Sequence, residues 1–368
     1  MRSHVEDLAR VLRTKGLLQG EIYLRNLTPL EKAWHVALSG GNPLKARQRA
    51  IRHKMALAKE ALSSFSSSSA LLVHAHDPFT AQGVLEHGKF PLVMTIHGPA
   101  AREFLMDFGD RDLAEWVRNL EAQAYARAKR IIAVDEGQKK ILVEEFSIPE
   151  EKIEVIANAV DPGALEEEAQ GALSNPLVNL LAEESLRKRV ILLPQSWRKT
   201  ACTWPCGPFP SCQEYAFWVA GDGPMKEALH REVRALGLEE RVRFLGAQPR
   251  SKVLALMRRA WAVLVPSIPV HGVVEATSMA ALEAMALGAP VVASHLGGLA
   301  EIIRHGENGL LFPPGNPEAL AVTLKRLEDP ALRERLIAGG LRYVREEHSA
   351  ERWGERVAAC YAKAIQGV

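Results

Sequence analysis

The fold predicted for this chain rests on one stretch, residues 263–312, which reads VLVPSIPVHGVVEATSMAALEAMALGAPVVASHLGGLAEIIRHGENGLLF. Short apolar runs alternate in it with polar turns and helix-forming segments. Gly288-Ala289-Pro290 ends one predicted helix just before the apolar run 291–293. This alternation is typical of a parallel sheet whose strands are joined by helices.

Two acidic residues mark the helix within this stretch. Seven residues separate Glu275 from Glu283, and positions eight apart lie about 80° apart around a helix axis. We expect Glu283 two turns into the helix and Glu275 just ahead of its first turn. The backbone N–H groups of Ser278, Met279 and Ala280 would then have no partner within the helix, so this helix start favours an anion such as phosphate.

An ordered series of short segments resembles the donor-binding half of retaining glycosyltransferases of the GT-B fold, of the group 1 or family four type. The matching residues are Val265-Pro266-Ser267, the Glu275/Glu283 pair, and the segments 282–286, 288–294, 297–299, 301–303 and 306–310. The resemblance implies an α/β protein with two Rossmann-like, doubly wound parallel-sheet domains that face a cleft. It also implies a C-terminal helix that crosses back to the first domain, with a buried face formed by Trp353, Val357 and Tyr361.

The same resemblance implies an activity. A hexose would move from a nucleotide sugar (a UDP-, GDP- or ADP-sugar) to a sugar, lipid-linked or small-molecule acceptor, with retention of anomeric configuration. Members of this fold generally work without a bound metal, and we expect neither a metal nor a cofactor. No Asp-x-Asp metal motif lies in a suitable loop, and no enzymic nucleophile is placed for a double displacement.

Residue roles are carried over position by position. Glu275 would approach the sugar hydroxyls near the reacting carbon, and Glu283 would accept hydrogen bonds from the ribose. His97, at the end of an expected strand, would approach the donor sugar, and Gly221 would allow close packing near the nucleotide. The structural alternatives are an exposed helix position for Glu283 and a purely structural histidine at position 97. We take the spacing of His74 and His76 to place these two residues on alternate faces of a strand, which would exclude a shared metal.

The domain boundaries follow from the alternation of elements and from the resemblance. Residues 1–161 are predicted to form the N-terminal acceptor-side domain, 162–189 the interdomain connection, 190–348 the donor-binding domain, and 349–368 the returning helix. Ser3 and Glu6 suggest a capping box for the first helix. In the resembled family a strand precedes that helix, so the first strand is interpreted as missing or as belonging to an earlier start.

Composition narrows the classes of partner. Lys and Arg total 46 against 44 Asp and Glu, which gives no reason to expect nucleic-acid binding. No apolar run approaches the roughly 20 residues of a membrane span, and no signal-peptide core is seen at the start. We therefore expect a cytoplasmic protein. The basic segment 43–62 is interpreted either as a solvated helix face or as a weak peripheral contact with anionic lipid at the inner membrane surface.

Residues 195–215 do not fit the rest of the chain. They hold three of the four cysteines and a cluster of prolines, where the family expects a helix and two cations that clasp the donor diphosphate. Lys199 or Arg198 is the candidate for that role. One hypothesis is a pair of compensating frameshifts that flank the segment, which the nucleotide sequence would test.

Two other functions compete with the transferase. The first is an inactive or impaired relic that acts at most as a nucleotide-sugar binding module, suggested by the missing strand and by segment 195–215. The second is a sugar-nucleotide epimerase of related architecture, for which no acid/base pair can be placed. The fingerprint GxGxxG and the Walker P-loop are both absent, which argues against a dinucleotide oxidoreductase or an NTPase.

Overall fold

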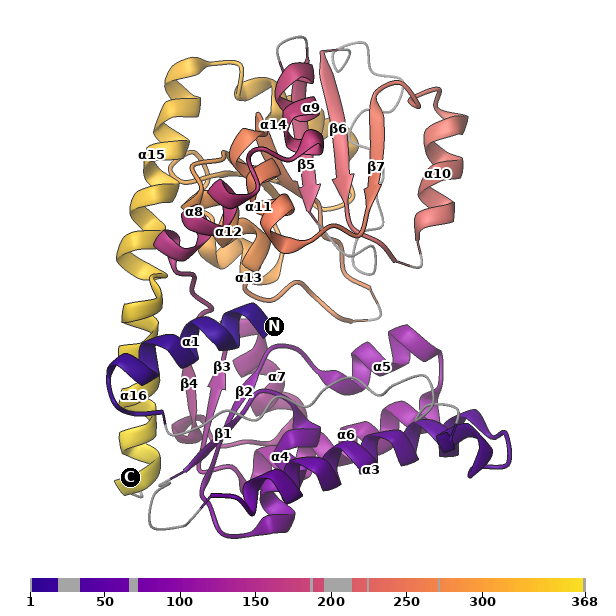
Figure 1. The fold of residues 1–368 in the computed structure, drawn as a ribbon, viewed down its shortest axis with the longest axis vertical. Coiled ribbons are helices and arrows are strands. Elements are labelled where there is room, and N and C mark those ends of the chain that lie inside the picture. The colour runs from indigo at the N-terminus through magenta and orange to yellow at the C-terminus, as the bar shows by residue number, and fades with distance from the viewer. Residues whose placement is uncertain are drawn as a thin grey trace. The chain divides into compact units, whose positions relative to one another are not determined.

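The computed structural model describes residues 2–18, 34–65, 72–185, 188–194, 214–223, 225–270 and 272–366. The chain divides into two compact units. Unit 1 comprises Met1–Ala157, His271–Ala276 and Trp353–Val368, and unit 2 comprises Asn158–Val270 and Thr277–Arg352. Each unit is built on one parallel sheet with helices packed against it (Figure 1). Two parallel-sheet α/β units agree with the fold class expected from the sequence.

The sheet of unit 1 has the strand order β1-β2-β3-β4, with every neighbouring pair parallel. Its strands are β1 (Val73–Ala75), β2 (Leu92–Ile96), β3 (Arg130–Ala133) and β4 (Ile153–Val155). Its helices are α1 (Arg2–Thr14), α3 (Pro43–Leu62), α4 (Pro78–His87), α5 (Ala100–Phe108), α6 (Arg111–Arg127), α7 (Glu136–Phe146) and the 3-10 turn Glu150–Lys152. All five residues of β2 are buried, as expected for a strand covered on both faces.

Aspartates start three of these helices. Asp77 accepts hydrogen bonds from the N–H groups of Phe79 and Thr80 at the start of α4, and Pro78 occupies the first helical position. Asp110 and Asp135 cap α6 and α7 in the same way. Because an Asp cap satisfies N–H groups that the helix leaves unpaired, these residues set where each helix begins after its strand or loop.

The last helix, α16 (Ala350–Gln366), completes unit 1. Trp353 and Val357 are buried on it, and Gly354 lies so close to α1 that an added Cβ would be 2.4 Å from Val11 Cγ1. The Tyr361 hydroxyl bonds to His74 of β1. The expected return of the last helix to the first domain is therefore confirmed.

The sheet of unit 2 has the order β10-β9-β8-β5-β6-β7 and is also parallel throughout. Its strands are β5 (Arg189–Pro194), β6 (Tyr215–Ala220), β7 (Val242–Gly246), β8 (Ala262–Val265), β9 (Val291–Ser294) and β10 (Leu310–Phe312). Its helices are α8 (Pro162–Gly171), α9 (Pro176–Glu184), α10 (Lys226–Ala235), α11 (Arg250–Arg259), α12 (Met279–Ala286), α13 (Gly297–Ile302), α14 (Pro317–Arg326) and α15 (Pro330–Glu347).

Segment 162–189, expected as a connection, is part of the core of unit 2. It forms α8 and α9 and then enters β5. Leu165, Ala169, Val178 and Leu181 on these two helices are buried in the same apolar cluster as Trp218 of β6. Glu166, Glu167 and Glu183 are exposed opposite these buried residues. The apolar residues recur at helical spacing, which the charge run conceals in the sequence.

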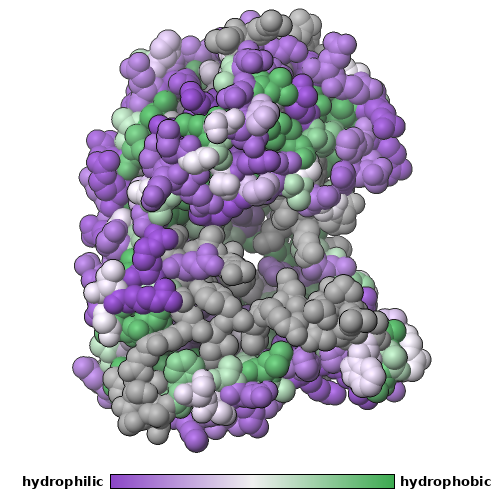
Figure 2. Space-filling model, viewed as in Figure 1, coloured by the Kyte–Doolittle hydropathy of each residue, from purple (hydrophilic) through white to green (hydrophobic). Residues whose placement is uncertain are grey.

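Other expectations differ from the structure or lie outside the described residues. Helix α1 includes Ser3 rather than beginning after it, so Ser3 is not the helix cap. Arg198 and Lys199, with their cysteine-rich surroundings, lie outside the described residues. Among the described helices, none combines the length and apolarity needed to cross a bilayer. The visible surface of unit 2 is mainly hydrophilic (Figure 2).

Candidate functional site

The N-terminus of α12 is the candidate anion site in unit 2. The helix begins at Met279, and Ser278 precedes it in an extended conformation without capping it through its side chain. The N–H groups at this helix start have no i−4 carbonyl to bind. Ser278 is buried, and Met279 and Ala280 are half-buried. The helix therefore starts a few residues later than predicted, and the positive end of its dipole lies at Ser278–Ala280.

Glu283 lies about one turn into α12 rather than two, because the helix starts as late as Met279. Its side chain is only 12% exposed. The Arg250 guanidinium, at the first position of α11, donates to Glu283 Oε1 from Nη2 at 2.8 Å and from Nε at 3.2 Å. Arg250 also donates to Glu168 of α8. One arginine thus joins two carboxylates from neighbouring helices of unit 2 (Figure 1).

The pKa of Glu283 reflects two opposing influences. Burial raises the pKa of this carboxyl, while the charge and the hydrogen bonds of Arg250 lower it and so offset part of the effect. Arg250 thereby favours the ionised carboxylate, which is the form that accepts hydrogen bonds from hydroxyl groups. The group is held in one orientation by two charge-assisted bonds to a single oxygen.

Two other predicted site residues have defined positions. Gly221 directly follows β6, and its N–H donates to Gly246 O at the end of β7 at 2.9 Å. It therefore lies at the carboxyl edge of the sheet, where ligands bind in doubly wound folds. Glu275 is half-buried and belongs to the segment His271–Ala276 of unit 1, whereas Glu283 belongs to unit 2. Joint action of the two acids on one donor stays a prediction.

In unit 1, three histidines lie in or directly after the adjacent strands β1 and β2. His76 is the first residue after β1, and His97 is the first after β2. His76 Nδ1 lies 3.1 Å from His97 Nε2. His74 Nδ1 lies 2.7 Å from the Tyr361 hydroxyl, and its Nε2 lies 2.7 Å from Thr95 Oγ1. His97, predicted to approach the donor sugar, is thus hydrogen-bonded to a second histidine, which in turn packs on a third.

The expectation that His74 and His76 lie on alternate faces of a strand was wrong. Their rings lie 4.3 Å apart, on one side of the strand, because residues i and i+2 of a strand share a face. Metal binding does not follow from this closeness, since both nitrogens of His74 are already bonded to Tyr361 and Thr95. Within the described residues, no group of three or more His, Cys, Asp or Glu side chains is arranged to hold a metal ion.

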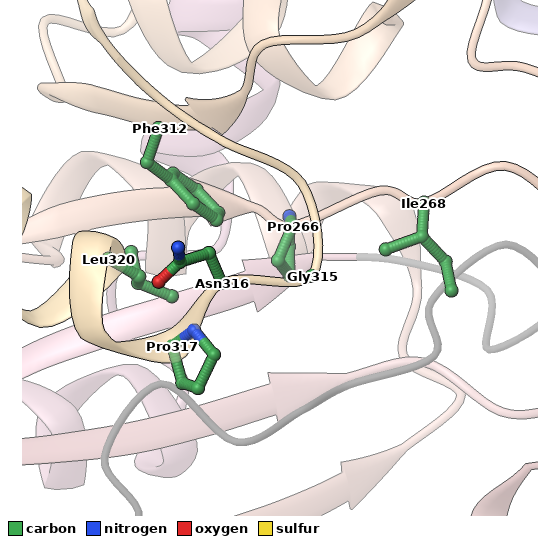
Figure 3. Close-up of a pocket in the computed structure, with 7 residues that line it drawn as sticks. All are labelled: Pro266, Ile268, Phe312, Gly315, Asn316, Pro317 and Leu320. Atoms are coloured by element: carbon green, nitrogen blue, oxygen red, sulfur yellow. The ribbon is translucent and has the colours of Figure 1, made fainter.

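A separate small pocket opens at the carboxyl ends of β8 and β10 (Figure 3). Its empty space is about 230 Å³, part of which is open solvent. It is lined by Pro266, Ile268, Phe312, Gly315, Asn316, Pro317 and Leu320. The Asn316 amide oxygen is occupied in capping α14. Among the described residues that line this pocket, none is a predicted site residue and none is charged.

Sequence reasoning missed Arg250 and assigned no site role to His76 or Tyr361. The position of Arg250 four residues after the end of β7 is a signal that could have found it, because such positions lie at the ligand edge of a parallel sheet. The pairing of Tyr361 with His74 spans 287 residues and has no local signal.

Comparisons with known proteins bear on this arrangement. The family model described as glycosyl transferases group 1 matches residues 209–342, and the model described as glycosyltransferase family 4 matches residues 1–164. One match covers most of unit 2 and the other most of unit 1. This chain is a GT-B glycosyltransferase. The α12 segment with Glu283 lies inside the group 1 match, and the histidine cluster, apart from Tyr361, lies inside the family 4 match.

Relatives and solved structures agree with this assignment to the glycosyltransferases. An uncharacterised glycosyltransferase of Methanocaldococcus jannaschii is 26% identical over 80% of this chain and 76% of its own length. The 2-deoxystreptamine glucosyltransferase of Streptomyces kanamyceticus is 30% identical over 66% of this chain and 62% of its own length. The sucrose-phosphate synthase of Thermosynechococcus elongatus superposes with a TM-score of 0.69 at 18% identity, over 99% and 93% of the two chains. Anabaena HepE in complex with UDP-glucose gives a TM-score of 0.66 at 19% identity, over 96% of this chain and 88% of that one.

Proposed function

We propose that the glycosyltransferase transfers a hexose from a nucleotide sugar to a sugar, lipid-linked or small-molecule acceptor with retention of anomeric configuration. The observation that carries this proposal is the N-terminus of α12. Ser278 directly precedes the helix, and the buried carboxylate of Glu283 lies one turn into it. An uncapped helix N-terminus favours a pyrophosphate group, and an ionised buried carboxylate favours hydroxyl groups. The structural neighbour HepE was solved with UDP and with UDP-glucose, which supports a nucleotide sugar as donor.

Each step of the reaction has a candidate group. As the bond between the anomeric carbon and the phosphate oxygen breaks, negative charge grows on the leaving diphosphate, and the α12 N-terminus would stabilise it. Lys199 or Arg198, outside the described residues, would add a cation. Glu283 would hold the ribose, Glu275 and His97 the sugar, and Gly221 would admit the nucleotide. The acceptor hydroxyl would attack from the face that the diphosphate leaves, which retains the configuration without an enzymic nucleophile.

The proposal is tested with a panel of UDP-, GDP- and ADP-hexoses. We expect donor hydrolysis or transfer with one nucleotide, without added divalent metal, and a product whose anomeric proton coupling in NMR matches that of the donor. Inversion at the anomeric carbon would refute the retaining mechanism. No binding and no turnover across the panel would refute the transferase and favour the inactive relic. The family matches to both units do not favour the inactive relic. An epimerase is not proposed, because both family models describe glycosyltransferases.

We also propose the peripheral lipid contact of α3. Its exposed residues Lys45, Arg49, Arg52 and Lys59 recur at helical spacing along one side, although Lys59 is 3.9 Å from Glu86. The exposed Trp34, before this helix, is 62% accessible. Co-sedimentation with vesicles tests it: the protein should bind vesicles containing phosphatidylglycerol and not pure phosphatidylcholine, and a triple charge reversal at positions 45, 49 and 52 should abolish binding. Equal binding by the reversed variant would refute the contact.

A further inference from the structure

We propose that His76 is a positioning residue for His97, and that the hydrogen bond between His76 Nδ1 and His97 Nε2 decides which nitrogen of His97 carries a proton when the donor binds. This inference rests on the proposed function, in which His97 approaches the donor sugar. It adds a second histidine to the site and a reason for the orientation of the first.

The backbone brings the two rings together. Strands β1 and β2 pair in parallel, with Val73 opposite Leu92, and both histidines stand one residue beyond the end of their strand. Their rings stack with centroids 5.5 Å apart and an interplanar angle of 23°. The 3.1 Å separation of His76 Nδ1 and His97 Nε2 lies within hydrogen-bond range.

The back of His76 is fixed by a third ring. His74 lies 4.3 Å from it, and each nitrogen of His74 has a partner at 2.7 Å, Thr95 Oγ1 on β2 and the Tyr361 hydroxyl on α16. Burial raises the pKa of Tyr361, so its hydroxyl stays protonated at neutral pH. Because both ring nitrogens of His74 are hydrogen-bonded, the orientation of its ring is fixed, and the His76 ring packs against it.

The protonation state of His76 limits which hydrogen bonds His76 and His97 can form with each other. Burial lowers the pKa of His76 to about 4, so near pH 7 this imidazole is neutral, with one donor and one acceptor nitrogen. A hydrogen bond between two ring nitrogens holds a single proton. The tautomer of His76 therefore sets whether His97 Nε2 donates or accepts, and a neutral His97 then has the opposite role at Nδ1.

The loop that carries His97 is anchored independently of His76. The fully buried carboxylate of Glu121 on α6 accepts hydrogen bonds from the N–H groups of Ala100 at 2.7 Å and Ala101 at 3.0 Å, and the Tyr125 hydroxyl donates to it at 3.0 Å. Loss of the His76 side chain should therefore remove the partner of His97 Nε2 and leave the backbone in place. That separation makes the inference testable by substitution.

The test compares His76→Leu, which removes the partner, with His76→Asn, whose amide occupies the position of Nδ1. In ¹⁵N–¹H ring spectra of histidine-labelled protein, assigned with a His97→Asn variant, wild-type His97 should show a single set of ring signals, from one arrangement of its ring protons. His76→Leu should show a mixture, and His76→Asn a single set again. The matched control His230→Leu removes a histidine of α10 that packs on Phe244 in unit 2, and should leave the His97 signals unchanged.

Kinetics supply the second readout. With the donor that the panel identifies, His76→Leu should lower kcat about tenfold or more with KM nearly unchanged, and His76→Asn should restore most of the loss. An unchanged His97 tautomer in His76→Leu, or a mixture in the wild-type protein, would overturn the inference. If His76→Leu does not fold, the wild-type spectrum and His76→Asn decide. A tautomer change without turnover of any donor would support the coupling and refute the proposed function instead.

Discussion

Arg250 donates two hydrogen bonds to one carboxylate oxygen of Glu283, from Nη2 at 2.8 Å and from Nε at 3.2 Å. The contact joins the first residue of α11 to the second turn of α12, and a third residue, Glu168, shares the same guanidinium. A carboxylate that is 12% exposed would be costly to ionise alone. Arg250 thus gives the proposed donor site an ionised acid of fixed direction.

Removal of Arg250 should show how far the ionisation of Glu283 depends on this arginine. In Arg250→Met the pKa of Glu283 should rise further above its ordinary value, since burial then acts without the opposing cation. A carboxyl with a raised folded-state pKa destabilises the fold above that pKa, so the variant should lose stability as pH increases. Urea denaturation at pH 7 should show a loss of about 1–3 kcal/mol. The double variant with Glu283→Gln should recover part of it, and strict additivity of the two changes would contradict the pairing.

The low pKa of His76 predicts an acid sensitivity. The folded protein keeps His76 neutral down to about pH 4, while the unfolded chain takes up a proton near pH 6.5. Between these values the unfolded state binds more protons, so stability should fall as pH falls, by up to about 1.4 kcal/mol per pH unit from this group. The measurement is the difference in urea-unfolding free energy between wild type and His76→Asn from pH 7 to pH 4. A difference that does not vary with pH would contradict the assignment.

Gly339 is predicted to be intolerant of any side chain. It lies in α15, and an added Cβ would be 2.0 Å from the backbone oxygen of Glu307, which no rotamer change can relieve. Gly339→Ala should therefore cost more than about 2 kcal/mol and lower the melting temperature of unit 2. Gly171→Ala, at the end of α8 with open space around it, is the matched control and should be neutral or slightly stabilising. Equal effects of both substitutions would contradict the packing of α15.

Cys360 should resist alkylation in the native protein. It lies on α16 with no exposed surface, and burial raises the pKa of its thiol to about 12. Since the thiolate is the reactive form, iodoacetamide at pH 8 should leave Cys360 unmodified, and urea should make it fully reactive. Peptide mapping by mass spectrometry reads this residue separately from the other cysteines. Labelling in native buffer at the rate of a free thiol would contradict the docking of α16.

Much of the fold could be predicted because its signals are local. The helix that ends before Gly288 and the strand that begins at Val291 follow from apolar runs and turn residues over a few positions. The contacts of the candidate site were harder to predict from the sequence. The contact of His74 with Tyr361 joins residues 287 positions apart, and that of Arg250 with Glu283 joins residues 33 apart. Such pairs depend on how elements pack and on which side each residue faces, which no short pattern encodes.

The start of α12 illustrates the same limit on a smaller scale. Its residue types indicated a helix and an anion site, but a shift of a few residues in the helix start changed the expected depth of Glu283 from two turns to one. Helix ends depend on the balance between capping and tertiary contacts, and Ser278 does not supply a side-chain cap. The sequence indicated the chemistry of the site better than its depth.

The docking of α16 onto α1 and β1 has a consequence for synthesis on the ribosome. Val11 packs against Gly354 and His74 bonds to Tyr361, and both of these partners are translated some three hundred positions later. The segments of unit 2 are all translated by Arg352, so that unit can assemble first. A nascent chain arrested before Trp353 would hold an incomplete unit 1, with apolar side chains of α1 uncovered and available to chaperones.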